Sequence, residues 1–101
     1  MARVVSINQA HTKNSREVAF NLDQPPIQGT IERVKYGVLS ISFENGVLMV
    51  RLPAGAPDLS RDSITTLNAK IADAEQAILE TVLAHDEELR RVSKATGLPL
   101  A

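Results

Sequence analysis

The feature that most constrains this chain is a single uninterrupted stretch from residue 58 to residue 97. Neither glycine nor proline occurs between Asp58 and Thr96, so nothing in the stretch stops a helix. At about 1.5 Å per residue, a helix of roughly 35 residues would reach about 50 Å, which is more than the width of a domain of this size. We therefore expect part of this helix to extend beyond the rest of its own chain.

The apolar positions in this stretch repeat with the period of an amphipathic helix. At about 100° per residue they form a stripe roughly 80° wide, and further aliphatic residues widen it in the middle. The members of the stripe are Ile64, Leu67, Ile71, Ala74, Ile78, Val82, Leu89 and Val92. The widening flank consists of Ala72, Leu79 and Leu83.

Both ends of the predicted helix carry residues suited to those positions. Asp58, Ser60 and Ser63 are alternative N-caps, because their side-chain oxygens can accept hydrogen bonds from the free amides of the first turn. Gly97 suits the position just after the last turn, where a positive φ is favoured. The helix is thus expected to occupy residues 58–97.

The first part of the chain carries the signals of an antiparallel sheet. Residues 4–7 are β-prone, and residues 17–22 alternate between polar and apolar side chains. Residues 29–36, 38–43 and 47–52 are expected to form three further strands. A β-bulge or a longer turn near Lys35 is expected, because a strict two-residue turn at Tyr36 and Gly37 would place Glu32 on the apolar face.

The strongest local signal is the Asn45-Gly46 pair, which favours a type I′ hairpin turn. This turn predicts a register in which Phe43 lies opposite Leu48 and Ile41 lies opposite Val50. One face of the hairpin would then be entirely apolar, and the other mostly polar. The apolar face comprises Leu39, Ile41, Phe43, Leu48, Val50 and Leu52. The opposite face comprises Ser40, Ser42, Glu44, Val47, Met49 and Arg51.

These elements predict an α+β fold, with an antiparallel sheet of three to five strands followed by one long C-terminal helix. We expect a single domain over residues 1–101, with the sheet in residues 1–57. The chain has 44% hydrophobic residues but only 3% aromatic ones, and it has no cysteine to form a disulfide. Association with another copy is the remaining common way for so short a chain to bury more surface.

The second half of the helix is the expected contact between copies. Its apolar side chains have no obvious place in the same chain, and a homodimer is the simplest arrangement that covers them. The sequence leaves open whether the two helices pair parallel or antiparallel. The predicted oligomer interface consists of Leu79, Val82, Leu83, His85, Leu89 and Val92.

A second surface is expected on the outward side of the sheet and its loops. Residues 1–57 carry six Lys or Arg against four Asp or Glu, whereas residues 58–101 carry five against eight. A mildly basic surface around a small apolar patch could bind a protein or a nucleic-acid backbone. Its candidate residues are Lys13, Arg16, Arg33, Lys35, Val47, Met49 and Arg51.

No catalytic, cofactor-binding or metal-binding motif is recognisable. His85 lies within the apolar stripe, where it is either a ligand or switch residue or, on the more conservative interpretation, a polar residue that sets the register of a helix pair. His11 has no partner at metal-ligand spacing. The sequence therefore favours a protein without enzymatic activity, cofactor or metal.

The function expected from these features is a small protein-protein interaction module that acts as a homo-oligomer: an adaptor, inhibitor or regulator. The alternative is a dimeric DNA-binding regulator that uses the basic residues of the sheet face and loop. No apolar run approaches the roughly 18 residues of a membrane span. With no signal peptide and no cysteine, a cytoplasmic location is expected.

Overall fold

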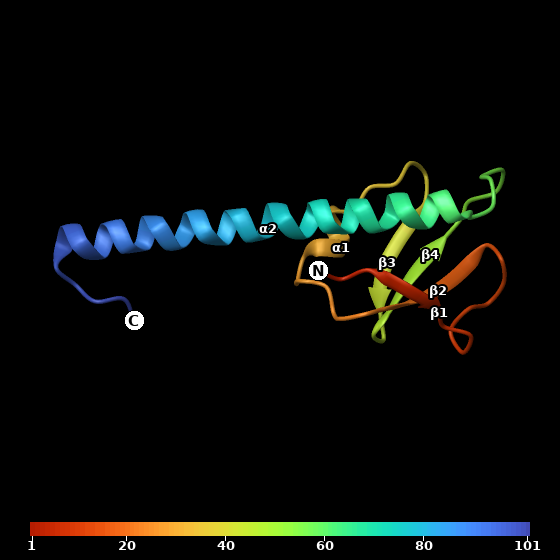
Figure 1. Ribbon diagram of the computed structural model, residues 1–101, viewed down its shortest axis with the longest axis horizontal. Helices are drawn as coiled ribbons and strands as arrows, with labels where there is room; N and C mark the ends of the chain where they lie inside the picture. Colours follow the sequence, from red (N-terminus) through yellow and green to blue (C-terminus); the bar gives the residue numbers. More distant parts are fainter.

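The computed structural model describes residues 1–101 and has an α+β fold, as the sequence predicts. Four strands and a short helix precede one long C-terminal helix (Figure 1). The elements are β1 (Val4–Ile7), β2 (Glu17–Leu22), α1 (Thr30–Arg33), β3 (Ser40–Glu44), β4 (Val47–Arg51) and α2 (Arg61–Thr96).

The four strands form one antiparallel sheet in the order β1-β2-β4-β3. The β3-β4 hairpin turns at Asn45 and Gly46, whose φ angles of 54° and 78° are the positive values that a type I′ turn requires. Its register is the predicted one, with Phe43 opposite Leu48 and Ser40 opposite Arg51. Turn chemistry and hydrophobic alternation agree here, and together they fix which side chains face the core.

Helix α2 begins at a capping box. The Ser60 hydroxyl accepts a hydrogen bond from the Ser63 amide, and the Ser63 hydroxyl accepts one from the Ser60 amide. Of the three candidate caps, Ser60 is therefore the one used. The helix ends where Gly97 adopts a φ of 71° and its amide donates to the Ser93 carbonyl, so the predicted C-terminal boundary is confirmed.

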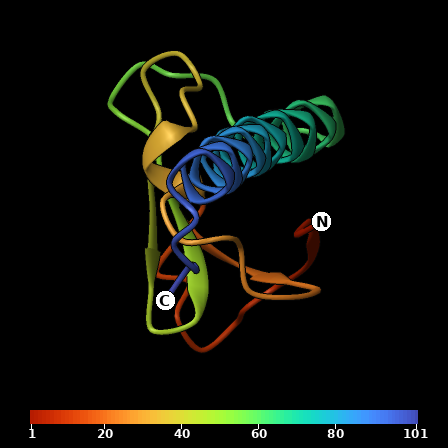
Figure 2. The same ribbon diagram turned by 90° about the vertical axis from the view of Figure 1, so that its left-hand side faces the viewer.

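The core lies between one face of the sheet and the first half of α2. Leu48, Val50 and Ile71 are fully buried at its centre. Figure 2, which looks along α2 from its C-terminal end, shows the sheet curving round one side of the helix. The apolar hairpin face is thus covered in the predicted manner, although Phe43 at its end is still 38% exposed.

The strand predicted over residues 29–36 is wrong, and so is the bulge predicted near Lys35. The chain forms the single helical turn α1 instead, which begins after Gly29 at a φ of 88°. Ile31 and Val34 are both buried, and residues three apart share a face in a helical turn but not in a strand. The next strand also starts later than predicted, at Ser40, because Val38 is 75% exposed in the preceding turn.

The prediction of an exposed apolar patch at Val47 and Met49 is also wrong. Each is only 5% exposed, and they form a second small cluster with Ala19. Strand β4 lies between β2 and β3, so Met49 has cross-strand neighbours on both sides, Ala19 and Ser42. An interior strand buries side chains on both of its faces, and the hairpin alone does not reveal that β4 is interior.

Candidate interaction surface

The second half of α2 extends beyond the sheet (Figure 1). All the buried residues of the helix lie between Leu67 and Glu75, and the Ile78 side chain still reaches the neighbourhood of Gly29. The molecule measures 59 × 25 × 19 Å and has a radius of gyration of 17.9 Å. A compact chain of this length would have a radius of gyration of about 13 Å. The helix therefore gives the molecule its elongated shape.

The extending half carries large apolar side chains in contact with solvent. Their exposed fractions are 40% for Leu79, 51% for Val82, 63% for Leu83, 38% for Leu89 and 59% for Val92. From residue 79 to the end of the chain, only Ser93 is even partly buried. We call this set, together with the exposed His85, the distal α2 surface: Leu79, Val82, Leu83, His85, Leu89 and Val92.

The distal α2 surface continues the face that packs on the sheet. At about 100° per residue, Val82, Leu89 and Val92 fall in the same sector as the buried Leu67 and Ile71. Leu79 and Leu83 lie on the flank of this sector, about 60° and 100° beyond Val82. One apolar stripe thus serves the intramolecular core in the first half of α2 and is uncovered in the second.

His85 lies in the middle of this stripe with no hydrogen-bond or ion-pair partner. No three His, Asp or Glu side chains are grouped so as to hold a metal ion. The residues around His85 on the stripe are aliphatic, so the site can act by burying apolar surface. It offers no pair of groups positioned for proton transfer or nucleophilic attack.

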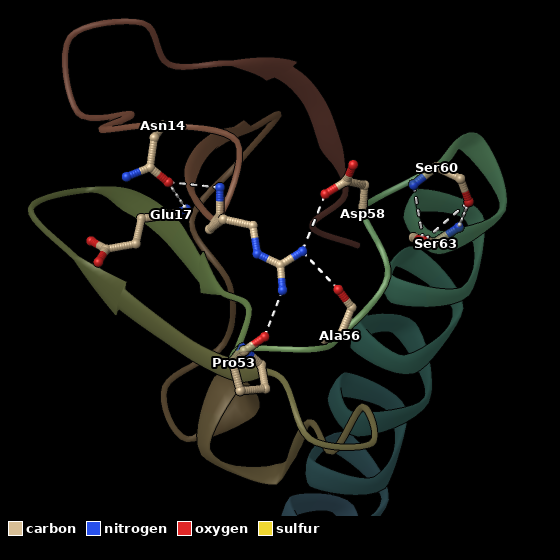
Figure 3. A network of polar contacts seen from close by, with 8 residues as sticks. Asn14, Glu17, Pro53, Ala56, Asp58, Ser60 and Ser63 are labelled. Atoms are coloured by element: carbon tan, nitrogen blue, oxygen red, sulfur yellow. Dashed lines mark hydrogen bonds and ion pairs between the residues drawn. The ribbon is translucent and has the colours of Figure 1, made fainter.

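Arg16, one of the predicted basic-surface residues, is instead part of the scaffold (Figure 3). Its guanidinium donates to the carbonyls of Pro53 and Ala56, at 2.6 Å and 2.7 Å, and to the Asp58 carboxylate at 3.1 Å. These contacts fasten the segment between β4 and α2 to the start of β2. Arg16 therefore helps to set the direction in which α2 leaves the sheet.

The other predicted basic residues lie in two groups, Lys13 with Arg51 and Arg33 with Lys35. Arg51 is on the outer face of the sheet, paired with Glu44 at 3.6 Å and bonded to the Ser42 hydroxyl. Lys13, in the loop before β2, pairs with Glu17, the first residue of that strand. Arg33 and Lys35 lie beside a shallow depression between α1 and α2, whose walls also include Lys70 and Asp73. Acidic side chains lie beside both groups, Glu17 and Glu44 in the first and Asp73 in the second.

Two polar side chains of α2 have structural roles that the sequence does not reveal. The Glu75 carboxylate, 2% exposed, accepts hydrogen bonds from the amides of Ala2 at 2.8 Å and Ile27 at 3.4 Å. The Asn68 side chain accepts one from the Val4 amide at 2.7 Å. Together they dock the N-terminal segment against the helix. A charged residue at the edge of the apolar stripe, at position 75, is the one signal that could have indicated this.

A second depression lies between the start of α2 and the β1-β2 end of the sheet. Its walls include Ile7, Val18, Leu59 and Ile64, all aliphatic, together with polar groups around Ser60.

No helix of the protein is both long enough and apolar enough to cross a membrane. The protein matches no known family, no curated protein and no solved structure at a significant level.

Proposed function

We propose that this protein is a non-enzymatic protein-protein interaction module that self-associates through the distal α2 surface. The observation that carries the proposal is a row of large aliphatic side chains, 38% to 63% exposed, on and beside a helix face that only His85 interrupts between Val82 and Val92. Soluble proteins seldom leave such a row uncovered unless it meets a partner. The sheet domain then serves as the part that each protomer presents to other proteins.

The expected strength of self-association follows from the exposed area. Covering a half-exposed aliphatic side chain gains about 1 kcal/mol, so the five in each protomer contribute about 10 kcal/mol to a pair. Association costs about 4–15 kcal/mol in lost freedom of motion. At the low end of this cost the balance is about 6 kcal/mol, which corresponds to a Kd of tens of micromolar, so the dimer is to be sought at that concentration and above.

Light scattering after size-exclusion chromatography tests this proposal. At high concentration we expect about twice the 10.9 kDa mass of the chain. Val82→Asp should return the protein to a monomer, because it places an unpaired charge in the contact. A monomeric wild type over this whole concentration range would contradict the proposal.

The matched control is Ala84→Asp, two residues away. Ala84 is exposed and lies about 160° round the helix from Val82. This variant adds the same charge to the same turn, so it should keep the mass of the wild type. If both variants lose the dimer equally, the contact is not on the distal α2 surface.

A further inference from the structure

The position of the sheet determines which way two distal α2 surfaces can meet. The sheet and the α1 segment cover the apolar face of α2 up to Ile78, and the distal surface is the continuation of that same face. Packed helices lie about 8–10 Å apart. In a parallel, in-register pair, the first halves of the two helices would therefore also be in contact, in the space that both sheets already occupy. Sliding parallel helices past one another removes this clash only by separating the two distal surfaces.

An antiparallel pair has no such conflict. The free segment from Leu79 to Thr96 is about 27 Å long at 1.5 Å per residue. Two such segments can overlap completely while each sheet lies beyond the end of the other helix. Figure 1 shows the space that the second helix would fill, below the extending half of α2 and beside the sheet.

The charges of the free segment do not decide the direction, which rests on the position of the sheet. The first part of the segment carries Glu80 and the acidic run 86–88, whereas its last part carries Arg90, Arg91 and Lys94. A parallel pair would set acidic against acidic and basic against basic. An antiparallel pair centred near residue 87 also sets the acidic run 86–88 of each helix against the same run of the other, and only Glu80 then lies level with a basic residue, Lys94 of the partner subunit.

We propose that a second copy of this chain packs antiparallel on the distal α2 surface, with Val82 of each protomer opposite Val92 of the partner subunit. The inference rests on the proposed function and adds its orientation and register. The same register sets His85 opposite the partner's Leu89, so the one polar residue of the stripe meets an aliphatic side chain. The tail after Gly97 lies on this side of the helix, held by a hydrogen bond from the Ser93 hydroxyl to the Leu98 carbonyl, and it swings aside on pairing.

Cysteine cross-linking tests the orientation directly, because the natural chain has no cysteine. Two single variants, Val82→Cys and Val92→Cys, are oxidised separately and as an equimolar mixture. In the antiparallel pair, residues 82 and 92 of different chains are at the same level. Two copies of residue 82 are then about 15 Å apart along the axis, whereas a disulfide requires Cα atoms within about 7 Å. We expect rapid cross-linking in the mixture and little in either variant alone.

Each of the other outcomes shows which part of the proposal is wrong: the orientation, the register or the dimer itself. Rapid cross-linking of each variant with itself shows a parallel pair and overturns the inference, while the proposed function stands. A dimer by light scattering without any cross-link overturns the register or the surface. A monomer by light scattering removes the proposed function and the inference together. Ala84→Cys mixed with Val92→Cys is the control, and it should cross-link no faster than free collision allows.

Discussion

At the scale of single residues, the polar groups that matter most to this fold are those that join distant parts of the chain. Glu75 is separated from Ala2 by 73 positions in sequence, yet their hydrogen bond fixes the N-terminal segment on α2. Arg16 bonds to carbonyls 37 and 40 positions away. Composition and periodicity are local properties, so neither pattern indicates where such partners lie.

Replacing Glu75 with alanine should destabilise the protein by about 2–4 kcal/mol, because two backbone amides in or near the core lose their acceptor. Urea denaturation followed by circular dichroism measures this change. The control is Glu80→Ala, an exposed carboxylate on the same helix that should change stability by no more than about 0.5 kcal/mol. Equal stabilities of the two variants would contradict the role assigned to Glu75.

At the scale of elements, the local sequence was sufficient to predict a strand pair or a helix where two independent signals agreed. The hairpin follows from the Asn45-Gly46 turn together with alternation, and α2 from its period together with caps at both ends. The turn α1 could not be predicted in this way, because four residues are too few to show a period. Only the shared burial of Ile31 and Val34 distinguishes a helical turn from a strand there.

The two halves of α2 should respond differently to the same kind of substitution. Ile71→Ala removes a fully buried side chain and should cost about 2–5 kcal/mol of folding stability. Val82→Ala should cost less than about 0.5 kcal/mol in dilute, monomeric protein, since Val82 is 51% exposed. Denaturation at low concentration measures both. A large loss for Val82→Ala would show that the distal half is covered within the monomer.

At the scale of the whole molecule, the sequence predicted the existence of an uncovered helix half but not the direction in which it pairs. That direction depends on which side of α2 the sheet occupies and how far along the helix it reaches. Both are set by long-range packing between the core residues of the sheet and α2, such as Leu48 and Ile71. The predicted exposure of Val47 and Met49 was wrong for the same reason, since their burial depends on the position of β4 inside the sheet.

The length of the dimer in solution follows from the length of one molecule and the length of the overlapping helix segments. Two molecules 59 Å long that overlap antiparallel over roughly 27 Å span about 90 Å, whereas a parallel pair would be little longer than one molecule. Small-angle X-ray scattering at a concentration where light scattering reports a dimer measures the maximum dimension. The Val82→Asp variant supplies the reference for the monomer. A dimer with a maximum dimension near 60 Å would have its two sheets side by side. The sheet would then have to leave the face of α2 that it covers here.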